Sequence, residues 1–264
     1  MAGVLKDIFG RDKPVVGVVH LPPLPGSPRF SGGIAQILGR AKADAEALRS
    51  GGADGAIVEN FGDAPFFPDR VEPETIAAMS LAVAEVGRCL PVGVNVLRND
   101  ARAALGIAAA TGARFIRVNV HTGAMATDQG IIEGRAHETL RARRALGADV
   151  AVLADVLVKH GRTLAGEDLA RAAQDAARRG LADALIVTGA ATGVAPQMED
   201  VLAVREAARD VPLLVGSGVD EGNAREFLAV ADGLIVGSAF EAAGLAGNPV
   251  EAERVRRVVS AARG

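Results

Sequence analysis

Eight short apolar segments recur along the chain, separated by Ala-rich segments that carry most of the polar residues. Each apolar segment is a nearly continuous run of aliphatic, largely β-branched residues, which is typical of strands buried on both faces of a parallel sheet. The eight predicted strands cover residues 14–20, 54–60, 91–97, 114–120, 149–156, 182–189, 211–219 and 232–240.

The segments between these strands have the spacing of amphipathic helices. The predicted helices cover residues 34–50, 73–88, 100–111, 131–146, 167–179, 198–209, 221–229 and 249–262. Eightfold alternation predicts an α/β fold, a single (β/α)8 TIM barrel. A doubly wound open sheet is the alternative, but no dinucleotide-type glycine fingerprint follows the first strand. The 264 residues suit one barrel and no linker divides them, so we expect one domain, 1–264.

Alternation within the strands predicts which side chains face the barrel axis. In the strand 114–120, Ile116, Val118 and Val120 form an aliphatic set that should lie under the helices, so Arg117 and Asn119 should face the axis. The same reasoning gives three further inward side chains, Glu59, Asn95 and Asp155. These residues come from four consecutive strands, mostly near the carboxyl ends, where barrel active sites lie.

The predicted catalytic residues are Glu59, Asp155, Arg117, His20 and Lys159. Both acids end their strands and are candidates for acid/base catalysis. Arg117 lies deepest and has two interpretations: it stabilises developing negative charge, or it is a scaffold that pairs buried carboxylates. The alternation does not fix the direction of His20.

The last two strands end in Gly-Ser turns, in VPLLVGSGV at 211–219 and DGLIVGSAF at 232–240. Two such turns on neighbouring parallel strands can direct backbone N–H groups at one anion. The predicted phosphate-binding residues are Gly216, Ser217, Gly218, Gly237 and Ser238. A small phosphorylated or otherwise anionic molecule is therefore the expected ligand.

Polar residues at and beyond the strand ends form the predicted substrate-binding set, which comprises Asn95, Asn119, Arg98, Asp128, Gln129, His160 and Thr188. The two asparagines would orient hydroxyl groups, and Arg98 would either clamp an anion or form a surface pair. Asp128 and Gln129 lie in a long glycine-containing loop after the fourth strand, which we expect to be a lid.

The charge balance of 29 basic and 32 acidic residues, net −3, gives no basic stripe, so nucleic-acid binding is not expected. Neither a signal-peptide core nor a membrane-length apolar run occurs, so we expect a cytoplasmic protein without membrane insertion. No cofactor is predicted. A divalent metal stays open, because His20, Glu59, Asp155 and His160 could together hold one, although they are scattered and show no compact ligand spacing. Adjacent Phe residues at 66–67 favour a homo-oligomer.

Seven motifs together resemble one family over essentially the whole chain: VVHLPPLPGSPRF, DGAIVENFGDAPF, GVNVLRND, FIRVNVHTGAMATDQGIIEG, ADVLVKH, IVTGAATG and LVGSGV. They identify the chain as similar to the BtpA family, also called the BtpA/SgcQ family. The resemblance implies a barrel of the ribulose-phosphate-binding type. It also implies two different roles, a factor for photosystem I biogenesis or stability and an enzyme of sugar metabolism in SgcQ-like members.

We therefore expect an enzyme that acts on a small phosphorylated sugar or related phosphate ester, by isomerisation, carbon–carbon cleavage or glycosidic cleavage. Carboxylates at the C-terminal mouth of the barrel would transfer protons. One alternative is a noncatalytic assembly or stability factor for a membrane complex. A flavin- or nucleotide-binding barrel that uses the same phosphate site is another.

Overall fold

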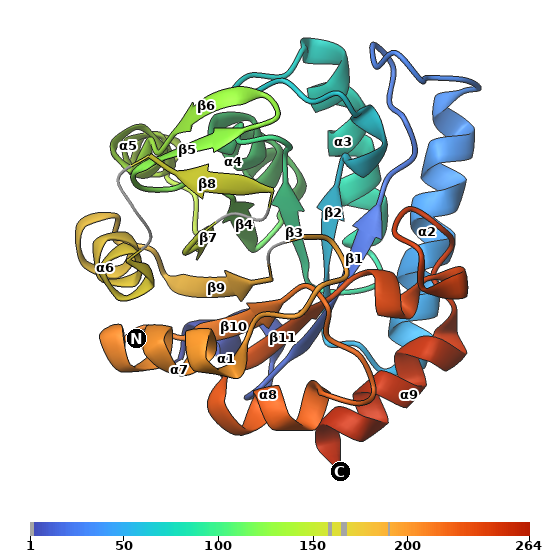
Figure 1. Ribbon diagram of the computed structural model, residues 1–264. Coiled ribbons are helices and arrows are strands. Elements are labelled where there is room, and N and C mark those ends of the chain that lie inside the picture. The colour runs from blue at the N-terminus through green and yellow to red at the C-terminus, as the bar shows by residue number, and fades with distance from the viewer. Residues whose placement is uncertain (1–2, 158–159, 165–167, 190) are drawn as a thin grey trace.

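A closed barrel of eight parallel strands forms the centre of the molecule (Figure 1). The computed structural model describes residues 3–157, 160–164, 168–189 and 191–264. The barrel strands are β1 (Val15–His20), β2 (Gly55–Glu59), β3 (Val92–Asn95), β4 (Phe115–Val118), β7 (Ala151–Asp155), β9 (Ala184–Thr188), β10 (Leu213–Gly216) and β11 (Gly233–Val236). The last strand pairs with the first, with Val15 beside Leu234, which closes the barrel. The predicted (β/α)8 fold is confirmed.

Helices surround the barrel on its outside (Figure 1). They are α2 (Ile34–Gly51), α3 (Pro73–Val86), α4 (Ala101–Thr111), α5 (Ala136–Leu146), α6 (Leu169–Gln174), α7 (Met198–Ala207), α8 (Ala224–Val230) and α9 (Ala252–Arg263). Local signals fix several of their ends. Asp100 caps α4 by accepting a hydrogen bond of 2.8 Å from the Ala103 N–H, and Gly52 ends α2 in the left-handed region at φ 90°.

Two separate cores follow from the alternation along the strands. Ile116 and Val118 belong to the core between strands and helices, whereas Phe115 and Leu153 belong to the core inside the barrel. A short helix, α1 (Val4–Phe9), closes the N-terminal end of the barrel, where the Phe9 and Phe115 rings meet edge to face with centroids 5.4 Å apart. The barrel interior is therefore apolar at this end, and its polar side chains lie at the other.

A small three-stranded sheet stands where a loop and the start of a helix were expected. The strands β5 (Ala124–Thr127), β6 (Gly130–Glu133) and β8 (Gly161–Thr163) form it in the order β6-β5-β8 (Figure 1, upper left). The predicted helix 131–146 was wrong over its first residues, because Ile132 is buried while Ile131 is 61% exposed, the alternation of a strand. The hairpin of β5 and β6 follows β4, and β8 follows β7. Because β4 and β7 are neighbours in the barrel, β5 and β8 can pair.

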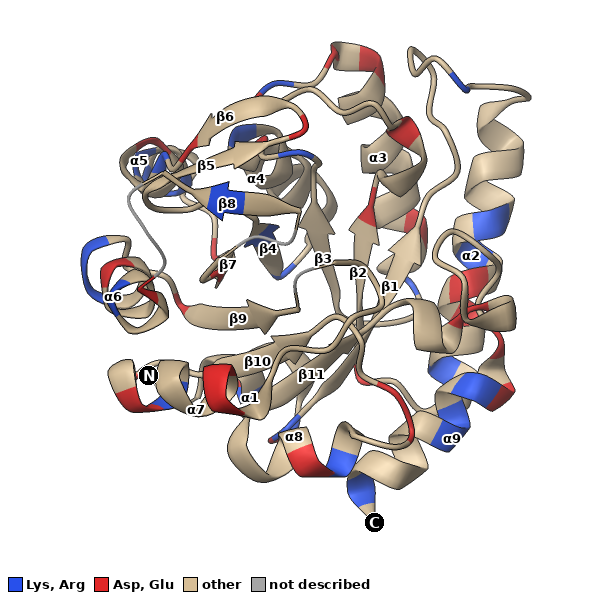
Figure 2. Cartoon of the chain, in the orientation of Figure 1, with Lys and Arg blue, Asp and Glu red and all other residues tan. Residues whose placement is uncertain are grey.

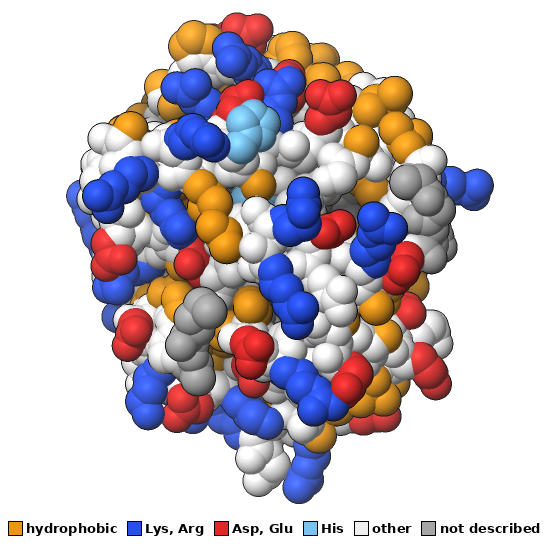
Figure 3. All heavy atoms as spheres, turned by 90° about the vertical axis from the view of Figure 1, so that its left-hand side faces the viewer, with side chains coloured by type: hydrophobic (Ala, Val, Ile, Leu, Met, Phe, Trp, Pro, Cys, Tyr) orange, Lys and Arg blue, Asp and Glu red, His pale blue; other side chains and the backbone are white. Residues whose placement is uncertain are grey.

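Charged residues are carried mainly by the outer helices, as Figure 2 shows, and the strands are largely uncharged. On the face shown in Figure 3, basic and acidic side chains are interspersed. Among the described residues, no helix combines the length and apolar character needed to cross a bilayer. Phe67 is 49% exposed, and the homo-oligomer stays a prediction.

Candidate functional site

A buried ion pair lies at the centre of the barrel mouth. The Nε and Nη2 groups of Arg117 donate to the two oxygens of Asp155, each at 3.0 Å, and Asn119 Nδ2 donates to Asp155 Oδ2 at 2.9 Å. Desolvation alone would lower the pKa of Arg117, but the charge and hydrogen bonds of Asp155 outweigh it and raise the pKa. Since both Asp155 oxygens are engaged, this pair suits charge stabilisation better than proton transfer.

Asparagine side chains extend this network to β3. Asn95 Nδ2 donates to Asn119 Oδ1 at 3.0 Å and to the Arg117 carbonyl at 3.2 Å. Asn95 Oδ1 is buried and has no hydrogen-bond partner among the described residues. A buried acceptor without a donor is uncommon in folded proteins, so Asn95 offers a place for a ligand hydroxyl.

His20 lies between two carboxylates. Its Nδ1 is 2.7 Å from Glu241 Oε1, and its Nε2 is 3.8 Å from Glu59 Oε1. Glu241 is fully buried, and its other oxygen accepts a hydrogen bond of 3.1 Å from the Gly247 N–H. A carboxylate bonded to one ring nitrogen fixes the imidazole orientation and directs the other nitrogen toward the reacting groups.

A narrow space at the barrel mouth, here called the axial cavity, brings the predicted groups together. Its volume is about 30 Å³. The predicted site residues that line it are His20, Glu59, Arg117, Ser217, Gly218, Gly237 and Ser238. The two Gly-Ser turns thus share one cavity with a histidine, a carboxylate and a guanidinium.

The segment 191–195, after β9, narrows the axial cavity. Ser217 Oγ donates to the Ala191 carbonyl at 3.0 Å, and a Cβ on Gly218 would lie only 2.0 Å from the Ala195 nitrogen. Gly218 also has a φ of +61°, so both its conformation and this close approach require glycine. With the segment in this position, the axial cavity has room for about two water molecules.

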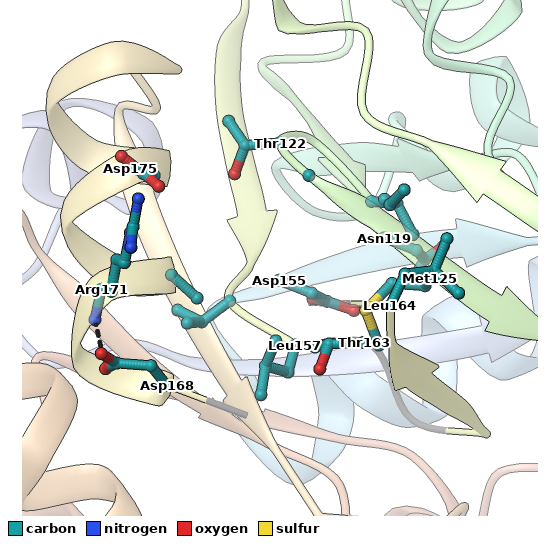
Figure 4. Close-up of a pocket in the computed structure, with 15 residues that line it drawn as sticks. Asn119, Thr122, Met125, Asp155, Leu157, Thr163, Leu164, Asp168, Arg171 and Asp175 are labelled. Carbon is teal, nitrogen blue, oxygen red and sulfur yellow. Dashed lines mark hydrogen bonds between the residues drawn. The ribbon is translucent and has the colours of Figure 1, made fainter. Parts of the chain in front are cut away.

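A second, larger space, here called the side cavity, has a volume of about 610 Å³ (Figure 4). It lies between the small sheet, the carboxyl ends of β4 and β7, and α6. Asp155 lines the side cavity while Arg117 lines the axial cavity, so their ion pair separates the two spaces.

Arg98 is buried, so the surface pair considered for it from the sequence was wrong. Burial lowers its pKa, against the attraction of Glu59, Asp155 and Asp128. These carboxylates place Arg98 within electrostatic reach of the mouth. Asp128 and Gln129 form the turn of the β5–β6 hairpin and bond to each other.

The described residues that remain from the predicted set do not line the axial cavity. Thr188 Oγ1 donates to the Leu157 carbonyl at 3.4 Å, and Gly216 is the last residue of β10. His160 is exposed, with Nε2 3.2 Å from Thr192 Oγ1. Lys159 lies outside the described residues. No group of three or more His, Cys, Asp or Glu residues within the described part of the chain is arranged to hold a metal ion.

Sequence reasoning missed Glu241 and the charged residues within and at the two ends of α6. Glu241 directly follows the last predicted strand, which ends at Phe240, and no local pattern marks its contact with His20, 221 positions earlier. Asp168, Arg171 and Asp175 follow one another at helical spacing, which a search for a helix face beside the mouth would have found.

A parallel eight-stranded barrel with polar groups at its C-terminal mouth belongs to the class of (β/α)8 proteins whose sites lie at that end. The BtpA family model matches residues 11–264, and the chain belongs to this family. It is 50% identical over 255 residues to the Photosystem I biogenesis protein BtpA of Synechocystis sp., covering 96% of this chain and 89% of that protein. It is also 45% identical to an uncharacterized protein of Pyrococcus furiosus, covering 97% of each chain.

Solved structures with the same fold are distant in sequence. An archaeal fructose 1,6-bisphosphate aldolase superposes with a TM-score of 0.58 at 14% identity, covering 99% of this chain and 98% of that chain. N-(5'-phosphoribosyl)anthranilate isomerase from Pyrococcus furiosus gives a TM-score of 0.55 at 15% identity, covering 94% and 98%. At such identities the likeness establishes the fold alone.

Removing one partner of the buried ion pair should destabilise the fold strongly. Arg117→Met leaves Asp155 buried without its cation and is expected to lower the free energy of unfolding by about 3–5 kcal/mol. The matched control is Arg257→Met, which breaks the exposed pair with Glu221 and should cost at most about 1 kcal/mol. Urea unfolding of both variants measures this. Equal losses would contradict the account.

Replacing Glu241 should change the hydrogen bonding of the His20 imidazole and therefore its nitrogen chemical shifts. Nitrogen NMR of histidine-labelled protein, which has four histidines, should show His20 protonated at Nδ1, since that atom faces the Glu241 carboxylate. Glu241→Gln is expected to alter the His20 nitrogen shifts and to leave those of His137 unchanged. His20→Asn assigns the signal. An unchanged His20 spectrum in Glu241→Gln would show that Glu241 does not control the ring.

Proposed function

We propose that this protein is an enzyme that acts on a small phosphorylated sugar or a related phosphate ester. The observation that carries the proposal is the axial cavity, which two Gly-Ser turns share with His20, Glu59 and Arg117. The turns lie at the ends of the neighbouring strands β10 and β11, and their backbone N–H groups suit a phosphate. Acid/base groups then stand beside the rest of the substrate.

Proton transfer is assigned to His20 and Glu59. Isomerisation, carbon–carbon cleavage and glycosidic cleavage each need one group to accept a proton and one to donate it. His20 Nε2 and the Glu59 carboxylate are 3.8 Å apart, close enough for both to reach one substrate. Arg117 stabilises negative charge that develops on a substrate oxygen, and the nearby asparagines hold hydroxyl groups.

Phosphate binding requires a change in the segment 191–195. The axial cavity of about 30 Å³ is too small for a phosphorylated sugar while this segment rests on Gly218. Movement of the segment away from the turns would open their N–H groups to the ligand. Closure over a bound phosphate would then exclude water from the reacting groups.

A noncatalytic role in the assembly of a membrane complex is the second candidate. It is favoured by the 50% identical relative in Synechocystis sp., whose name is Photosystem I biogenesis protein BtpA. The two candidates differ in what the mouth residues do. Glu59→Gln would abolish turnover of a phosphorylated substrate, whereas binding of a protein complex would survive it.

Thermal unfolding tests phosphate capture. Phosphorylated sugars, unlike their unphosphorylated counterparts, should raise the Tm by several degrees, because ligand at a hundred times its Kd contributes about 2.7 kcal/mol. Ser238→Asp puts a negative charge at the turn and should remove this rise. Ser50→Asp makes the same exchange at an exposed position of α2 and should retain it. A panel of phosphate esters that leaves the Tm of the wild type unchanged would refute the proposal.

A further inference from the structure

We propose that the substrate is a monophosphate whose other end carries hydroxyl or amino groups, bears no second anionic group, and occupies the side cavity. This inference rests on the proposed function and names the class of substrate. The side cavity is not needed to bind phosphate. Its volume of about 610 Å³ falls in the range of small-molecule sites and is large enough for the carbon skeleton of a sugar.

The position of the side cavity relative to the Gly-Ser turns fixes how a substrate would lie. In the closed order of strands, β11 and β4 are four positions apart, so they stand on opposite sides of the eight-stranded barrel. The turns follow β10 and β11, whereas the side cavity adjoins the ends of β4 and β7. A ligand with its phosphate at the turns would extend across the mouth beside Arg117, which lines the axial cavity, and Asp155, which lines the side cavity.

The charges that line the side cavity disfavour a second phosphate. Among the described residues that line the side cavity, the charged side chains are three carboxylates, those of Asp155, Asp168 and Asp175, and one guanidinium, that of Arg171 (Figure 4). Arg117 neutralises Asp155, which leaves two carboxylates against one cation. Arg179 Nε lies 3.8 Å from Asp175 Oδ1, but the Arg179 side chain is 83% exposed and the Asp175 side chain 43%, so solvent weakens this attraction.

The same lining suits a neutral or amino-bearing sugar carbon skeleton. Carboxylate oxygens accept hydrogen bonds from hydroxyl and ammonium groups. Met125 and Leu164 add an apolar surface on the opposite side of the cavity from α6, and Leu157 lies between the two sides, so the C–H faces of a sugar can pack there (Figure 4). The side cavity thus combines acceptors on one wall with apolar contact on another.

Calorimetric titration with matched pairs of ligands tests the inference. Fructose 6-phosphate and fructose 1,6-bisphosphate form one pair, ribulose 5-phosphate and ribulose 1,5-bisphosphate another, and inorganic phosphate is the reference. In the wild type, the monophosphate of at least one pair should bind more tightly than inorganic phosphate. It should also bind about tenfold more tightly than its bisphosphate, because like charges in the side cavity repel the second phosphate.

Charge reversal at Asp175, the residue that directly follows α6, should change this preference. Asp175→Lys is expected to tighten bisphosphate binding about tenfold and to leave inorganic phosphate binding nearly unchanged. Asp175→Asn should give a ratio of monophosphate to bisphosphate affinity between those of the wild type and the lysine variant. This variant keeps the test valid if the lysine variant does not fold. Asp210→Lys is the matched control, since Asp210 is exposed and lies before β10, at the N-terminal end of the barrel. It should leave the ratio as in the wild type.

The outcomes separate this inference from the proposed function. The inference would be overturned, while phosphate capture stands, if bisphosphates bound the wild type as tightly as monophosphates. It would also be overturned if Asp175→Lys and Asp210→Lys had the same ratio of monophosphate to bisphosphate affinity. Monophosphates that bind no more tightly than inorganic phosphate would overturn it as well. Failure of every phosphate compound to bind would overturn the proposed function, and the inference with it.

Discussion

The buried pair of Arg117 and Asp155 is the interaction around which the barrel mouth is arranged. Two buried charges above the apolar interior of the barrel are stable because each satisfies the other, with Asn119 as a further donor. The pair links β4 to β7 and forms the boundary between the axial cavity and the side cavity. It also keeps a fixed cation beside Glu59, where negative charge can be stabilised.

With Asp155 engaged in this way, the proposed function places proton transfer on the other side of the mouth. His20 and Glu59 lie on the paired strands β1 and β2, and Glu241 holds the imidazole from behind. The apolar side chains of α1 cover the N-terminal end of the barrel interior. In the proposed function, charge pairing, proton transfer and phosphate binding use residues of different strands around one opening.

Alternation along the strands was enough to predict the fold and the inward direction of Glu59, Asn95, Arg117, Asn119 and Asp155. It could not predict the direction of the His20 side chain, because both faces of β1 are aliphatic: Val16 and Val18 line the interior, while Val15 and Val19 lie outside. The contact of His20 with Glu241 joins positions 221 residues apart and leaves no local pattern. The small sheet was missed because its two parts come from separate loops and become a sheet only when β4 and β7 are neighbours.

In the proposed function, the two Gly-Ser turns bind the phosphate of a substrate beside His20 and Glu59. The decisive experiment is a crystal structure of the protein with a tightly binding sugar monophosphate. We expect phosphate density within hydrogen-bond distance of the backbone N–H groups at Gly218 and Ser238, with the sugar directed toward Asp155. Phosphate bound at another surface, with the segment 191–195 still resting on Gly218, would contradict it.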